Sequence, residues 1–290
     1  MTPPEATRID VRKTYKLYVG GAFPRSESGR SYVVEDAKGR FLANASQASR
    51  KDARDAVKAA RSAFGGWSGR TAYNRGQVVY RIAEVLEGRR VQLETEVREA
   101  TGLTPARART SVDAAIDRLV WYAGWADKIA QVTGSANPVA GPYFNHSAPE
   151  PTGVVAVVAP DDPLLGLVSV LAPVITTGNT AVVLASEPAP LPAITLSEVM
   201  ATADVPGGVV NVLTGFRAEV APWLASHMDV NGLDLTGVDD RELARDLEAA
   251  AAENLKRVRR PRAEELTETP ALDRMTTFLE TKTVWHPMGI

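Results

Sequence analysis

Three kinds of side chain in this 290-residue chain could support chemistry: nucleophiles, metal ligands and clustered cations. The chain contains no cysteine, which excludes thiol nucleophiles, disulfide bonds and thiolate metal sites. Its three histidines, His146, His227 and His286, lie far apart in the sequence and form no ligand-spaced pair such as HxxxH. We therefore assign no metal site.

The run KRVRRPR, residues 256–262, places five cations in seven residues. Such a run can bind nucleic acid or another anion. No aromatic residues alternate with its cations, no RNA-binding signature accompanies it, and Glu264, Glu265 and Glu268 follow closely. We therefore interpret the run as a solvated linker partly neutralised by these carboxylates, and we expect no nucleic-acid partner.

Composition narrows the class of protein. A hydrophobic content of 44% and a formal charge of -2 indicate a globular chain without global attraction for nucleic acid or anionic membranes. No apolar run approaches the roughly 20 residues of a spanning helix, and the N-terminal residues have no apolar signal core. We expect a cytoplasmic protein with no membrane association.

The first half of the sequence predicts short strands followed by helices. Residues 15–44 contain β-prone pieces such as KLYV and SYVV, separated by glycine breaks. Ser49 and Asp52 have capping-box spacing before an apolar helical stripe, which is expected to end at the glycine pair 65–66. Further apolar stripes predict a helical block as far as Gln131.

The second half changes character. Residues 137–152 hold four prolines, so we expect an extended segment or edge ribbon rather than a helix or central strand. Continuous apolar runs separated by helix-length segments then follow at 153–158, 180–184, 209–213 and 232–235. Such runs are typical of a parallel sheet with right-handed crossovers, which predicts a doubly wound α/β fold.

Several passages, in the same order, resemble the aldehyde dehydrogenase superfamily. They include GPYFNHSAPEPTGVVAVVAP, GNTAVVL, VPGGVVNVLTG, DLTG, NLKRV and the terminal KTVWHPMG. The resemblance covers residues 15–258 and 275–289 and implies three regions. These are a Rossmann-like α/β cofactor-type domain (15–136 and 153–258), a small β oligomerisation ribbon (137–152 and 275–290), and a connector that replaces the catalytic domain (259–274).

The resemblance also implies that the family's catalytic groups are missing. The family uses a cysteine nucleophile and a glutamate base, but ELGG, expected after LKRV, is replaced by residues 259–262, Arg-Arg-Pro-Arg. The family's oxyanion-stabilising asparagine corresponds to Asp161, whose carboxylate would repel a developing alkoxide. We expect no catalytic residues, and the retained C-terminal motif implies an internal loss rather than truncation.

The implied cofactor site is degenerate. The lysine with which the family holds the adenosine ribose is replaced in VVLASEP, which leaves Ala185 and Glu187 near that place. The glycine-serine helix start that binds the pyrophosphate becomes Gly237-Val238, and Asp239 and Asp240 there would compete with a phosphate. We expect no cofactor, with NAD(P) binding as the alternative. The candidate cofactor-binding residues are Glu187, Gly215 and Gly237.

Tyr143, Phe144, Val284 and Trp285 are the candidate interface residues. Aromatic residues are ordinarily part of a core, but the family's ribbon protrudes and pairs with the catalytic-domain sheet of a neighbouring subunit. We therefore expect the late strand around Trp285 to join the Tyr143 segment of its own chain. The outer edge of that ribbon should then seek a second subunit.

These expectations combine into a functional hypothesis. The sequence predicts a catalytically inactive aldehyde dehydrogenase-like subunit that associates with a full-length paralogue and supports or regulates it. A homo-oligomer is the alternative assembly, although a copy of this chain lacks the acceptor sheet. The alternative functions are a stand-alone NAD(P)-binding sensor and, less favoured, an active oxidoreductase with a different nucleophile.

Overall fold

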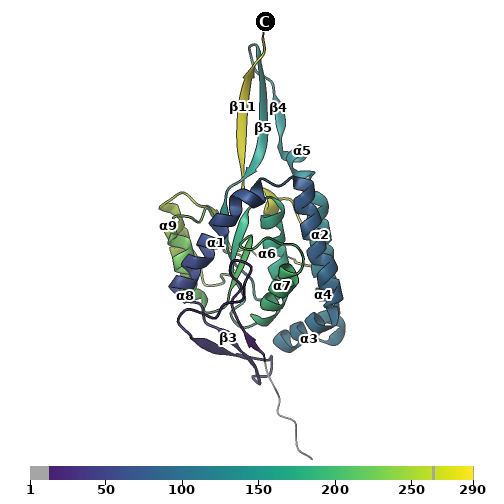
Figure 1. Ribbon diagram of the computed structural model, residues 1–290, viewed down its shortest axis with the longest axis vertical. Helices are drawn as coiled ribbons and strands as arrows, with labels where there is room; N and C mark the ends of the chain where they lie inside the picture. Colours follow the sequence, from purple (N-terminus) through teal and green to yellow (C-terminus); the bar gives the residue numbers. More distant parts are fainter. Residues whose placement is uncertain (1–12, 263–264, 290) are drawn as a thin grey trace, which may run out of the picture.

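The computed structural model of the protein describes residues 13–262 and 265–289. Its centre is a five-stranded parallel sheet with strand order β10-β9-β6-β7-β8. Helices cover both faces of this sheet, and a narrow three-stranded antiparallel ribbon projects from one end of the body (Figure 1). The predicted α/β class, with its helical block and ribbon, is confirmed.

The strands of the central sheet are short and mostly apolar. They are Val154–Val158 (β6), Thr180–Leu184 (β7), Val210–Leu213 (β8), Gly232–Asp234 (β9) and Arg257–Arg259 (β10). From β6 the chain builds outward through β7 to β8, then returns to place β9 on the other side of β6. The carboxyl ends of β6 and β9 therefore form the switch point at which doubly wound sheets bind ligands.

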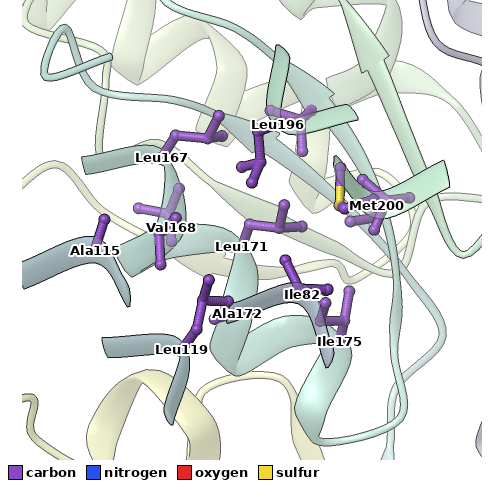
Figure 2. Close-up of a cluster of buried hydrophobic side chains, with 14 of the residues drawn as sticks. Ile82, Ala115, Leu119, Leu167, Val168, Leu171, Ala172, Ile175, Leu196 and Met200 are labelled. Carbon is purple, nitrogen blue, oxygen red and sulfur yellow. The ribbon is translucent and has the colours of Figure 1, made fainter. Parts of the chain in front are cut away.

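Two helical layers cover one face of the sheet. The inner layer consists of α6 (Leu165–Thr176) and α7 (Leu191–Ala201), and the outer block of α2 (Ala72–Gly88), α3 (Arg90–Thr101), α4 (Pro105–Trp125) and α5 (Ile129–Thr133). Figure 2 shows the contact between the layers, where Ile82 and Leu119 approach Leu171 and Ile175. The last long helix of the block ends at Trp125, and only the short α5 extends the block past Gln131.

The opposite face is covered by α1 (Arg50–Ser68), α8 (Arg217–Ser226) and α9 (Arg241–Ala252). The predicted capping box is present, since the Ser49 N–H donates to the Asp52 carboxylate at 2.7 Å. The prediction that α1 stops at Gly65 is wrong. The helix continues to bury Trp67, whose indole N–H donates to a carbonyl of α6 at 2.9 Å, and this burial outweighs the cost of about 1 kcal/mol per glycine.

The N-terminal strands form a small sheet of their own. Thr14–Tyr15 (β1), Ser31–Glu35 (β2) and Phe41–Ser46 (β3) lie in the order β1-β3-β2, and β2 and β3 pair as an antiparallel hairpin. The N–H of Tyr18 donates to the carbonyl of Val212 at 2.9 Å, and the N–H of Val212 donates to the carbonyl of Tyr18 at 2.7 Å. This bridge covers the β8 edge of the central sheet.

The ribbon consists of Ser135–Asn137 (β4), Tyr143–Pro151 (β5) and Leu279–Pro287 (β11), in the order β11-β5-β4. The late strand pairs with the Tyr143 segment as predicted. This proline-rich segment is extended and part of a ribbon, as predicted, but within the ribbon it is the central strand, contrary to the prediction. The nitrogens of Pro149 and Pro151 face the β4 side, beyond the three residues of β4. Their missing N–H groups therefore remove no bond to β11.

The interpretation of residues 256–262 as a solvated linker is wrong, because residues 257–259 form β10 at the edge of the central sheet. The segment after β10 also packs against the body. Arg118 of α4 donates to the carbonyls of Leu266 and Glu268, the latter at 2.8 Å. The short helix Asp273–Thr276 (α10) then buries Met275, and Phe278 is buried beyond it. This segment therefore adds to the core of the α/β body.

The four arginines of residues 256–262 form ion pairs within the chain. Arg260 lies 2.9 Å from the Glu248 carboxylate, Arg259 lies 3.0 Å from that of Asp273, and Arg257 lies 3.7 Å from that of Glu280. These partners differ from the expected Glu265 and Glu268, and Glu264 lies outside the described residues. In the two described ranges, no helix has the length and apolarity that crossing a membrane requires.

Candidate functional site

The candidate cofactor residues follow one another along a single edge of the central sheet. Glu187 follows β7, Gly215 follows β8 and Gly237 follows β9, so each lies beyond the carboxyl end of a parallel strand. Asp161 follows β6 at the same edge. The chain order therefore places all of them where a doubly wound sheet binds its ligand.

An arginine that the sequence reasoning missed crosses this edge. Arg217, the first residue of α8, donates to the Asp161 carboxylate and, at 3.1 Å, to the Ala159 carbonyl. The hydroxyl of Ser186 donates to the same carboxylate at 3.0 Å. The Arg217 side chain is only 14% exposed, so this ion pair holds Asp161 in place beyond the end of β6.

Glu187 is hydrogen-bonded to the start of the same helix, α8. Its carboxylate accepts the backbone N–H of Arg217 at 2.9 Å, at the start of α8. Burial, and then the charge of Glu187, raises the pKa of Tyr32, so this neighbouring phenol stays neutral. The Glu187 carboxylate thus stabilises a helix terminus rather than standing free for a ribose hydroxyl.

Gly237 allows the ends of β6 and β9 to approach each other. Its N–H donates to the Val158 carbonyl at 3.0 Å, and a Cβ at this position would lie 2.0 Å from the Ala159 oxygen. Three residues on, the Asp240 carboxylate accepts the N–H of Glu242 at 2.8 Å and caps α9. Since that carboxylate already occupies the helix terminus, the residues present do not fit a dinucleotide pyrophosphate.

Replacing Gly237 with alanine is expected to destabilise the protein by about 1–3 kcal/mol, because the added methyl group has no space. Gly66→Ala is the matched control: its Cβ would meet open space in a helix, so we expect about 0.5–1 kcal/mol of stabilisation. Urea unfolding of both variants measures the difference. Equal stability of the two variants would contradict the close approach at Gly237.

All four candidate interface residues lie on the ribbon and are exposed. The exposed fractions are 42% for Tyr143, 49% for Phe144, 37% for Val284 and 56% for Trp285. Tyr143 and Trp285 pack edge to face, with ring centroids 5.8 Å apart. The ordinary assignment of these residues to a buried core is therefore wrong, and their role as an interface stays a prediction.

The four residues divide between the two faces of the ribbon, since directly opposed residues share a face. Tyr143 and Trp285 lie on one face, and Phe144, opposite His286, lies on the other. The Phe144 ring centroid is 6.2 Å from that of His146 and 6.4 Å from that of His286. Pairing of distant strands thus places His146 and His286 beside the same Phe144 ring, which spacing along the sequence could not indicate.

Polar side chains join the three strands of the ribbon. The Asn137 amide donates to Asn145 and to the Ser147 hydroxyl at 2.5 and 2.7 Å, and Ser147 lies 2.8 Å from the Thr283 hydroxyl. Asn145 and Ser147 are buried. The sequence reasoning missed this network, although the alternation of polar residues in YFNHS is a signal for it. Among the described residues, no group of three side chains suited to a metal ion occurs.

The outer edge of β11 carries free backbone groups. Phe278 accepts a bond from Thr152 at 3.3 Å and Met288 donates one to Pro142 at 2.8 Å, so even-numbered residues of β11 face β5. Because successive residues alternate, Thr281, Thr283 and Trp285 direct their N–H and C=O groups outward. Within the described residues β11 has a strand partner on one side only, and Pro287 is its only proline.

Known proteins resemble this chain in both sequence and structure. Residues 23–260 match the model described as the aldehyde dehydrogenase family. Aldehyde dehydrogenase, cytosolic 1 of Elephantulus edwardii is 34% identical over 263 residues, covering 88% of this chain and 51% of that protein. Retinal dehydrogenase 2 of Gallus gallus is 34% identical over 265 residues, covering 89% of this chain and 50% of that protein.

Solved structures agree with the sequence comparison. HpcC from Thermus thermophilus superposes with a TM-score of 0.80 at 29% identity, over 85% of this chain and 47% of that one. The NAD+ complex of an aldehyde dehydrogenase from Bacillus cereus gives 0.79 at 27% identity, over 85% and 50%. The chain thus spans about half the length of the relatives it matches. On these grounds it belongs to the aldehyde dehydrogenase family.

Proposed function

We propose that this protein is a catalytically inactive subunit that associates with a full-length NAD(P)-dependent aldehyde dehydrogenase through its ribbon, and that it stabilises or regulates that partner. The observation that carries the proposal is the outer edge of β11, with its outward N–H and C=O groups and the exposed Trp285. A strand edge of this kind binds another edge strand by β-augmentation.

Burial of apolar surface supports a protein partner. Covering roughly 100 Å² of exposed aromatic surface contributes about 2–3 kcal/mol at 25 cal/mol per Å². The ribbon presents such surface on both faces, with Phe144 on one and Trp285 on the other. A partner that pairs with β11 and covers either face therefore gains from both backbone bonds and apolar burial.

The chemistry of the chain supports the inactive assignment. The sequence has no cysteine to form the covalent intermediate of the family. The resemblance aligns Asp161 with the family's oxyanion-stabilising asparagine, and the Asp161 carboxylate is paired with Arg217. A subunit with these residues contributes to assembly rather than to oxidation.

Co-expression with a full-length aldehyde dehydrogenase, followed by size-exclusion chromatography and mass determination, tests the proposal. We expect both chains in one peak, with the mass of a hetero-oligomer. A long-lived monomer or homodimer that ignores the larger protein would contradict the proposal. The homo-oligomer, the alternative assembly, would be recognised by a mass that is a multiple of this chain alone.

A stand-alone NAD(P)-binding sensor is the second candidate, and the intact doubly wound sheet favours it. Isothermal titration of the isolated chain with NAD+ and NADH separates the two functions, since micromolar binding would favour the sensor. An active oxidoreductase would instead produce NADH from an aldehyde and NAD+ without any other protein. For the inactive subunit we expect neither signal.

A further inference from the structure

A groove of about 490 Å³ lies between the first turns of α1 and the end of α8. We name it the basic groove, and its lining residues are Arg50, Lys51, Arg54, Trp223, Ser226 and His227. We propose that the basic groove binds an acidic protein segment that carries an apolar anchor residue. This activity does not depend on the ribbon or on the proposed subunit role.

Arg50 and Trp223 form the centre of the basic groove. The Arg50 guanidinium carbon lies 4.2 Å from the Trp223 ring centroid, and the tryptophan is 41% exposed. Stacking on the ring holds the planar guanidinium in place, while no carboxylate of the described residues pairs with it. Its N–H groups are therefore pre-oriented for a carboxylate from another molecule, which an arginine binds in bidentate fashion.

The charge of the basic groove is one-sided. Three cations line it and no carboxylate does. The pairs Lys51–Glu27 and Arg54–Asp55 lie on exposed surface, where such pairs are weak. Lys58 continues the cationic stripe of α1 one turn beyond Arg54. An incoming acidic segment would thus gain charge complementarity along α1.

His227 closes one end of the basic groove without adding charge at neutral pH. Burial, assisted by the nearby charges of Lys58 and Lys256, lowers the pKa of His227 despite the opposing Asp229. Its Nδ1 accepts the N–H of Asp229 at 3.1 Å. This end of the groove therefore suits an apolar anchor beside the indole rather than a second anion.

The arrangement favours a protein over a nucleic acid. Single-stranded nucleic acids bind by stacking bases on open aromatic faces, but Arg50 already covers one face of Trp223. Tryptophan and arginine together are typical of the residues that dominate protein interfaces. The basic groove thus offers a place for an apolar anchor residue beside Trp223 and the Arg50 guanidinium as a bidentate donor to a carboxylate.

Fluorescence anisotropy of the full chain with a short fluorescein-labelled peptide of glutamates around one phenylalanine tests the proposal. We expect salt-dependent binding that Arg50→Glu weakens by at least about tenfold, as for loss of a close interfacial charge pair. Trp223→Ala should weaken binding of this peptide more than binding of a glutamate-only peptide, because it removes the apolar contact as well as the support for Arg50. Glutamate at the first position of α1 suits the helix dipole, so Arg50→Glu should fold normally.

Arg245→Glu is the matched control, because Arg245 is an exposed arginine on α9 that pairs only locally with Glu242 and Asp246. This variant should bind the peptide as the wild type does. Absence of binding by the wild type, or equal loss in the Arg50 and Arg245 variants, would overturn the proposal. Tighter binding of an oligothymidylate than of the peptide would assign the groove to nucleic acid instead.

Discussion

Thr281→Pro is expected to weaken association with a full-length aldehyde dehydrogenase by at least about tenfold, or 1.4 kcal/mol. The N–H of Thr281 points away from β5, toward the outer edge of β11. Proline at this position removes a donor that a pairing strand needs, and its ring obstructs the approach of that strand. Co-purification and analytical ultracentrifugation of the two chains measure the effect.

Thr281→Ala is the matched control, since it keeps the outward N–H and should assemble as the wild type does. Both variants should unfold at the same temperature as the wild type, because the bonds between β11 and β5 come from even-numbered residues. If Thr281→Pro assembled normally, β-augmentation through this edge would be wrong. Trp285→Ala should also weaken assembly without unfolding the sheet, because Trp285 lies outside the core.

Much of the fold could be predicted from the sequence, because the apolar runs and their order along the chain determine the strands of the central sheet. GVVAVV and TAVVL are buried on both faces, as continuous apolar runs should be, and they became β6 and β7. The pairing of the last strand with the Tyr143 segment also followed from the resemblance. The errors concern places where packing overrides a local rule, as where α1 passes through Gly65 to bury Trp67.

The site was less predictable, because contacts between distant residues determine it. Chain order placed Glu187 and Gly237 beyond the ends of their strands, but the Arg217–Asp161 pair joins residues that are 56 positions apart. No pattern indicates which side chain will meet Asp161 across the sheet edge. The same reason explains why His146 and His286 looked unrelated in the sequence.

The segment after β10 was expected to be a connector, and its two prolines, many charges and lack of an apolar stripe gave no sign that it packs against the body. Its apolar anchors are sparse: Met275 and Phe278 carry most of the burial. A methyl group at Gly232 would lie 2.6 Å from the Phe278 ring, so this ring packs directly on β9. Isolated anchors of this kind leave no periodic signal, although they fix the point from which β11 leaves the body.

Arg274→Ala is expected to destabilise the protein by about 3–5 kcal/mol, the range for breaking a buried ion pair. Arg274 and Asp234 lie 3.2 Å apart, and their side chains are only 4% and 1% exposed. Loss of the arginine leaves the Asp234 carboxylate buried at the end of β9 without its ion-pair partner, and only the weaker influence of the Arg259 charge remains. Urea unfolding at neutral pH measures the loss, and the transition should stay cooperative because the sheet core is unchanged.

The pH dependence of this loss identifies its cause. Burial raises the pKa of Asp234 above its ordinary value, and the charge of Arg274 opposes that rise. The folded state therefore holds the Asp234 proton more tightly than the unfolded state, so stability falls as the pH rises through the folded-state pKa. Without Arg274 this pKa rises further, and the destabilisation of the variant should be largest at neutral pH and shrink toward acid pH.

A double variant, Asp234→Asn with Arg274→Met, separates charge from packing. It removes both charges and keeps the acceptor for the Thr236 N–H, which lies 2.9 Å from Asp234. We expect it to recover most of the lost stability, since uncharged replacements of buried pairs are often tolerated. If the double variant were as unstable as Arg274→Ala at every pH, packing of α10 rather than the uncompensated charge would hold the segment after β10 against the sheet.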